Sequence, residues 1–153
     1  MLETNNACCF FGHRDAPYYI VPEIKSNIET LITECGVTTF YVGNQGRFDS
    51  MVVSVLKEMK NKYPQISYSI VLAYLPKENE KYNEKNTLYP YGIESVPKRF
   101  CISWRNNWMI DNSQYVICYI THITGGAAKF TEKAIKIGLN VINIGKNCDK
   151  LYL

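Results

Sequence analysis

Residues 105–144 constrain the fold of this chain more than any other part of its sequence. They read as the end of a helix, an apolar strand at 114–120, the pair Gly125–Gly126, a second helix and another apolar strand at 140–144. The strand at 114–120 is apolar almost throughout, as expected when a parallel sheet covers both faces of a strand. The helix that follows the glycines carries its apolar residues on one stripe, namely Ala127, Phe130, Ala134 and Ile137.

A strand, a glycine turn and a helix in this order can bind an anion, typically a phosphate. The helix start presents free backbone N–H groups and the positive end of the helix dipole, and glycines let the backbone approach a ligand. A plain turn between strand and helix is the alternative interpretation. The candidate phosphate-binding residues here are Gly125, Gly126, Ala127 and Lys129. Arg105 is a candidate for pairing with phosphate through its planar guanidinium, and Glu132 is a candidate ligand-facing carboxylate. Surface charges on their helices are the alternative for both.

The rest of the chain continues the alternation of strands and helices. Strands are expected at 7–11, 38–42, 66–75, 114–120 and 140–144, with a helical pattern between most of them. This order predicts a single domain over 1–153 with an α/β, Rossmann-like, doubly wound fold. Its sheet would have five mainly parallel strands and helices on both faces. The polar stretch 76–96 is long for a loop in a compact domain, which leaves a lid or a solvated surface as interpretations.

In such sheets, ligands bind outside the carboxyl ends of the strands. The segments 12–17, 43–49, 75–96 and 120–128 lie at that edge and hold most of the unusual polar residues of the sequence. The candidate ligand-binding residues in the first two segments are Gly12, His13, Arg14, Gly43, Asn44, Gly46 and Asp49. His13 and Arg14 are otherwise ordinary loop residues. Asp49, at a helix start, either bonds a sugar hydroxyl or holds the turn. Asp49 or Ser50 is the expected cap of the next helix, and as a cap Asp49 needs no ligand. His122, just past the fourth strand, is a weaker candidate.

Composition limits the classes of function. Because 46% of the 153 residues are apolar and 20% are charged, the chain is expected to be globular. The net charge of +3 suits an anionic small ligand and does not require nucleic acid. No apolar run approaches the ~20 residues needed to cross a bilayer. The N-terminus carries an acid where a signal peptide has basic residues, so we expect a cytoplasmic protein without a membrane partner.

The six cysteines fit that compartment. They show neither a C-x-x-C motif nor the Cys/His spacing of a zinc site, so the sequence indicates no metal and no cofactor. Cys8, Cys9 and Cys118 fall in expected strands, and Cys35 and Cys101 fall in expected helices. Buried free thiols that pack as small apolar groups are therefore expected.

Three stretches of the chain resemble the SLOG superfamily. They are Gly12-His13-Arg14 after the first strand, GNQGRFDS at 43–50, and residues 105–119 followed by GGAAKFTEKA at 125–134. This Rossmann-like group includes the DNA-processing protein DprA and the Lonely Guy enzymes. The chain is most similar to its small, single-domain bacterial members of unknown function. The resemblance covers residues 7–144, nearly the whole chain.

The resemblance also implies roles for particular residues. Lonely Guy enzymes are phosphoribohydrolases that release a base from a nucleoside 5′-monophosphate. They carry an Arg-Lys pair before the fourth strand and P-G-G-x-G-T-x-x-E after it. The similarity places that arginine on Arg105, with Asn106 as its neighbour, and the leading glycines on Gly125 and Gly126. It places the catalytic glutamate on Glu132.

Three residues depart from that motif. Thr124 replaces the proline, Ala128 the third glycine and Lys129 the threonine. The last two alter the helix start that would hold the phosphate, although Lys129 adds a positive charge there. We therefore expect phosphate binding, in which Lys129 contributes more than Glu132, and slow or absent base release.

The sequence thus favours a SLOG-type sensor or carrier for a phosphorylated nucleotide or nucleotide derivative. An N-glycosidic hydrolase acting on a nucleoside monophosphate is the alternative, so enzymatic activity stays open. Single-stranded DNA binding, as in DprA, is less favoured because no basic stripe with interleaved aromatic residues is present. A homodimer is also expected, because Trp104, Trp108 and Met109 give one helix more apolar surface than a sheet face requires. Packing under the stretch 76–96 is the alternative.

Overall fold

The chain forms one parallel sheet between two layers of helices. The computed structural model describes residues 6–75 and 86–145. Their strands are β1 Ala7–Gly12, β2 Thr39–Val42, β3 Ser67–Val71, β4 Thr87–Leu88, β5 Tyr115–Tyr119 and β6 Asn140–Asn143. Their helices are α1 Val21–Cys35, α2 Arg47–Lys62, α3 Cys101–Asp111 and α4 Gly126–Lys136, with 3-10 segments at Tyr18–Ile20, Ile93–Ser95 and Lys98–Phe100.

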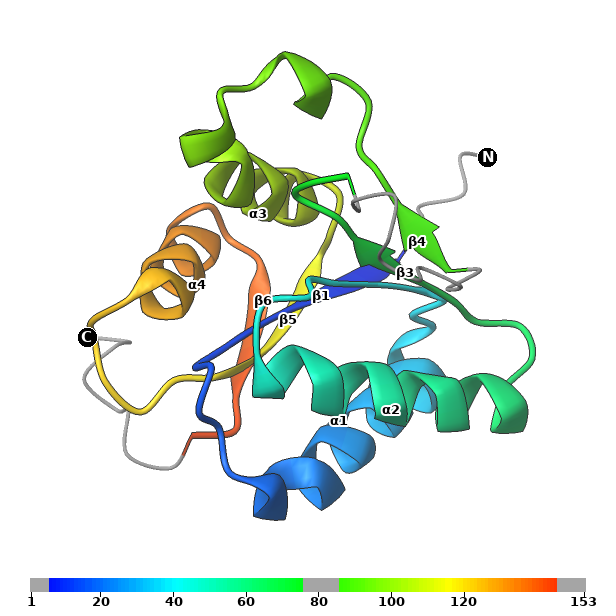
Figure 1. Ribbon diagram of the computed structural model, residues 1–153. Coiled ribbons are helices and arrows are strands. Elements are labelled where there is room, and N and C mark those ends of the chain that lie inside the picture. Colours follow the sequence, from blue (N-terminus) through cyan, green and yellow to red (C-terminus); the bar gives the residue numbers. More distant parts are fainter. Residues whose placement is uncertain (1–5, 76–85, 146–153) are drawn as a thin grey trace.

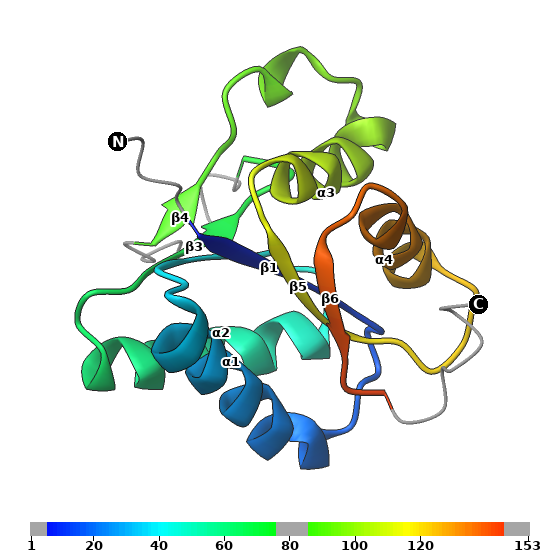
Figure 2. The same cartoon turned by 180° about the vertical axis from the view of Figure 1, so that it is seen from behind.

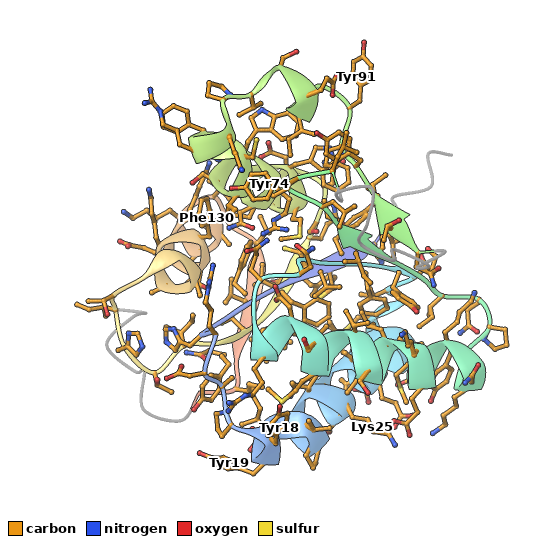
Figure 3. The ribbon with its side chains drawn as sticks, viewed as in Figure 1. Tyr18, Tyr19, Lys25, Tyr74, Tyr91 and Phe130 are labelled. Carbon is orange, nitrogen blue, oxygen red and sulfur yellow. The ribbon has the colours of Figure 1, made fainter. Side chains whose placement is uncertain are left out.

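The strand order is β4-β3-β2-β1-β5-β6, and every neighbouring pair is parallel. Helices α1 and α2 cover one face of the sheet, and α3 and α4 cover the other (Figures 1 and 2). The central strand β1 is buried on both faces: Phe10 packs into the α1/α2 core, and Phe11 stacks on Phe130 with ring centroids 6.0 Å apart. Phe130 belongs to α4 (Figure 3). The predicted doubly wound α/β fold is confirmed.

The sheet has one strand more than the five that were predicted, within the described residues. The additional strand β4 pairs only two residues with β3 at the sheet edge, and two residues show no periodic pattern that sequence could reveal. Strand β3 is shorter than the predicted 66–75, because the chain leaves regular pairing after Val71. Part of the predicted loop, residues 76–85, lies outside the described residues.

Helix α2 begins before its predicted cap. The cap was expected at Asp49 or Ser50, but the helix starts at Arg47 and Gly46 occupies the cap position. Asp49 therefore lies inside the first turn, where its carboxylate reaches back and accepts a hydrogen bond of 2.9 Å from the Gln45 amide. This contact fixes Asp49 beside the loop that joins β2 to α2.

The chain itself covers part of the apolar surface of α3, and Trp104 and Trp108 are half-buried. Trp104 packs beside Ile93 and Val96, and Trp108 lies edge-on to Tyr41 with ring centroids 5.1 Å apart. The structure does not test the homodimer, which stays a prediction. The described cysteines are all free thiols, and they are buried as expected except Cys35, which is half-buried. Burial raises the pKa of Cys9 to about 12.

The end of β1 is closely packed against α2. A Cβ added at Gly12 would lie 2.2 Å from the ring of Phe48, so this position accepts no side chain unless the ring moves. By contrast, a Cβ at Gly126 would have no heavy atom within 4 Å. Packing therefore requires a glycine at position 12 and does not require one at position 126.

We expect Gly12→Ala to lower the free energy of unfolding by about 1–3 kcal/mol, the usual cost of overpacking a core. Urea denaturation measures the change, and Gly126→Ala is the matched control because its methyl enters open space. Equal stabilities for the two variants would contradict the role assigned to the contact between Gly12 and Phe48.

Candidate functional site

A cavity of about 370 Å³ opens at the carboxyl edge of the sheet. Its walls come from the ends of β1 and β2, from α3, and from the loop and first turn that follow β5. Strand order reverses between β1 and β5, because the chain builds the sheet outward from β1 to β4 and then adds β5 on the other side. The cavity therefore occupies the position at which doubly wound sheets bind ligands.

Most of the predicted site residues line this cavity. They are Gly12, His13, Arg14, Gly43, Gly46, Asp49, Arg105, Gly125, Gly126 and Ala127. Asn44, Lys129 and Glu132 are exposed and are not part of its lining. Glu132 pairs instead with Lys136 at 3.1 Å, and the ammonium of Lys129 lies 5.8 Å from the ring centroid of Phe130.

Arg105 is buried at the floor of the cavity, with only 2% of its surface exposed. Its Nη1 donates to the carbonyl of Val71 at 2.7 Å, and its Nε donates to the side-chain oxygen of Asn106 at 2.8 Å. A Cβ at Gly43 would lie 3.0 Å from both the Arg105 guanidinium and the Asp49 carboxylate. Glycine at this position lets α2 and α3 bring opposite charges together beside the end of β2.

Burial is costly for both of these charges. It raises the pKa of Asp49, and it outweighs the Gln45 amide, Arg105 and Arg14, which all act to lower that pKa. Burial likewise lowers the pKa of Arg105, against the attraction of Asp49. A partly desolvated carboxylate and guanidinium in one cavity are polar groups that a ligand could satisfy.

The start of α4 is open toward the cavity. Gly125 has a φ of +95°, which favours glycine, and no side chain caps the helix. The first amides of a helix have no acceptor within it. Gly126 has neither a positive φ nor a close neighbour, so the protein's own packing does not explain why it is glycine. The geometry suits an anion that approaches the backbone closely.

Two histidines meet at the cavity, although His122 was the weaker prediction. The His13 and His122 rings stack at a centroid distance of 3.7 Å with 6° between their planes. The Thr121 amide donates to Nε2 of His13 at 3.1 Å. Burial lowers the pKa of His13, as does His122, whereas Asp15 raises it. The pairing of Gly12 with Tyr119 between β1 and β5 explains this meeting, because it brings the two following loops together.

The cavity also has an apolar part that sequence reasoning did not assign. Phe10, Phe11, Phe48, Ile102 and Met109 contribute to its lining. Each lies on an apolar helix or strand pattern that indicates only a core position, so no signal in the sequence separates these residues from the rest of the core.

Neither a metal site nor a membrane span is present in the part of the chain that the structure describes. Residues 6–75 and 86–145 contain no group of three His, Cys, Asp or Glu side chains that could hold a metal ion. None of the described helices is long and apolar enough to cross a bilayer.

Comparison with known proteins gives a family and a fold. The sequence model described as "YpsA: YspA SLOG family" matches residues 5–140. The X-ray structure of DNA processing protein A (DprA) from Streptococcus pneumoniae matches with a TM-score of 0.67 and 17% identity. That match covers 95% of this chain and 53% of DprA, so the chain spans about half the length of that protein. Among curated proteins, none has a matching sequence.

We expect Asp49→Asn to raise the free energy of unfolding of the ligand-free protein at about pH 7. Folding raises the pKa of this carboxyl, so the ionised form costs stability as pH rises through the folded pKa. The advantage of the variant should shrink as pH falls through the folded pKa toward the ordinary value of 3.8, because the wild-type carboxyl then becomes protonated. Urea denaturation across this range measures it. A loss of stability at neutral pH would show that the attraction of Arg105 outweighs burial.

Proposed function

Since the chain belongs to the YspA SLOG family, we propose that its cavity binds a phosphorylated nucleotide or nucleotide derivative and that the protein is a sensor or carrier of this ligand. The observation that carries the proposal is the uncapped start of α4, which opens on the same cavity as Arg14 and the Arg105–Asp49 pair. Anion-binding groups and hydrogen-bonding groups thus lie in one space.

The phosphate fits the start of α4. Backbone N–H groups at Gly126 and Ala127 and the positive end of the helix dipole favour an anion there. Gly126 leaves the approach free of a side chain. Arg14 lines the same cavity, is exposed, and packs its Cα and side-chain carbons on Gly46, so its guanidinium can add a charged contact.

The remainder of a nucleotide fits the other walls. A cavity of about 370 Å³ is the size of a small-ligand site. Asp49 can accept hydrogen bonds from sugar hydroxyls, while Ile102 and Met109 offer apolar surface to a base. Mixed lining of this kind is usual for small-molecule sites, in which a few polar groups fix the orientation.

Binding without chemistry is the better supported function. The hydrolase that the resemblance to Lonely Guy enzymes implies would require Glu132 at the ligand. Glu132 is exposed, pairs with Lys136 and does not line the cavity. At the position of the family's third glycine, Ala128 is 2% exposed and packs into the core, so it offers no extra room to the ligand.

We expect nucleoside monophosphates or diphosphates to bind at least about tenfold more tightly than the matching nucleosides, because charge-assisted hydrogen bonds contribute about 1.5–3 kcal/mol. Isothermal titration calorimetry measures this affinity. Arg14→Gln and Gly126→Ala should each weaken binding, whereas Arg99→Gln should not, because Arg99 is exposed and lies outside the cavity. Absence of binding across the panel would refute the proposal.

We further expect no rapid release of base from nucleoside monophosphates, since the carboxylate that would be required faces solvent. Chromatography of the reaction mixture detects a free base, and Glu132→Ala should leave nucleotide affinity within about twofold. Rapid release that Glu132→Ala abolishes would favour the hydrolase. Salt-dependent binding of a single-stranded oligonucleotide, without nucleotide binding, would favour a DNA-related role instead.

A further inference from the structure

His13 and His122 are the only two histidines in the sequence, and they stack face to face at the cavity. One ring follows β1 and the other follows β5, so two separate loops hold the pair together. His13 is buried at 8% exposure, whereas His122 is exposed and its Nδ1 lies 2.9 Å from the hydroxyl of Thr124. The pair therefore has an inner ring and an outer ring.

The hydrogen bonds determine where a proton can bind. Because the Thr121 amide donates to Nε2 of His13, that nitrogen carries no proton and the inner ring is neutral in this arrangement. A proton on Nε2 would break this bond and, with His122 also charged, would place two cations 3.7 Å apart. The stack therefore accommodates one proton, and His122 is the ring that is free to take it.

Other charged groups around the pair both favour and oppose protonation of the histidines. Asp15, in the loop of His13, favours protonation, whereas Arg14 in the same loop opposes it. Asp49 of α2 and Arg105 of α3 line the same cavity with opposite charges. The start of α4 directs its partial positive charge at this space and opposes a proton there. An anion bound at α4 would reverse that last effect.

We propose that His13 and His122 form a proton-coupled anion clamp. When the phosphate of the ligand binds at the start of α4, His122 takes one proton from solvent and holds the anion as an imidazolium. His13 stays neutral and positions His122 by stacking. The identity of the anion as a ligand phosphate rests on the proposed function, whereas the one-proton behaviour of the pair rests on its geometry alone.

Linkage gives the sign of the pH dependence. The bound state holds the His122 proton more tightly than the free state, so anion affinity rises as pH falls through the bound-state pKa of His122. Each unit by which the anion raises that pKa corresponds to about a tenfold difference in affinity between the acidic and alkaline limits.

Sulfate is the appropriate probe, because it stays a dianion over the range in which histidine titrates. NMR of protein labelled in its histidine rings resolves both residues directly, since the chain has only two. In the free protein we expect His13 to stay neutral to a lower pH than an ordinary histidine, because burial lowers its pKa. Sulfate should raise the pKa of His122 and leave His13 neutral at about pH 6 to 8.

Two variants separate the proton from the stack. His122→Phe keeps a flat ring on His13 but cannot be charged, so the pH dependence of sulfate affinity should be lost. Glu58→Gln should keep it, because Glu58 is exposed, pairs with Lys25 and lies outside the cavity. A proton that binds first to His13, or a His122 pKa that sulfate leaves unchanged, would overturn the proposal. If sulfate raises the pKa of His122 but no nucleotide binds, the clamp is upheld and the proposed ligand is refuted.

Discussion

The shape of the cavity depends on the interactions of the buried guanidinium of Arg105. Its helix α3 belongs to one layer, yet its hydrogen bond goes to the end of β3, and its charge lies beside Asp49 of the opposite layer. A long, planar, permanently charged side chain can span this region, and a lysine could not satisfy the same set of acceptors. Gly43 makes this arrangement possible, because a side chain there would lie 3.0 Å from both charged groups.

Burial makes that arrangement energetically costly for the protein. Burying two charges is rarely repaid by their attraction alone, and here burial dominates at both groups. Groups with perturbed pKa values cluster at functional sites, so Asp49 and Arg105 mark this cavity as a candidate binding site. The glycines differ in a similar way. A side chain at Gly12 or Gly43 would collide with neighbouring atoms of the chain, whereas a side chain at Gly126 would enter open space.

Sequence patterns predicted the layers of this fold because strand and helix periods persist over many residues. They also placed Gly12, Arg14, Gly46 and Gly126 at one edge, since parallel strands bring their carboxyl ends together. The sequence patterns predicted less well the direction in which individual side chains point. Whether Glu132 faces a ligand or solvent depends on the rotation of α4, and the start of α2 depends on contacts of Asp49 with its own loop. Predicting the stack of His122 on His13 would have required the knowledge that β1 and β5 are neighbours.

The central position of β1 has a consequence for synthesis of the chain. Its first residues pair with β2 early, but its other edge pairs with β5, whose Tyr115 lies opposite Cys8. The contact between Thr121 and His13 joins residues 108 positions apart. A nascent chain that ends before β5 therefore exposes one edge of its most apolar strand, which is a surface prone to aggregation. The cavity can assemble only after most of the chain has left the ribosome, so chaperones would meet this protein with β5 and β6 still missing from its sheet.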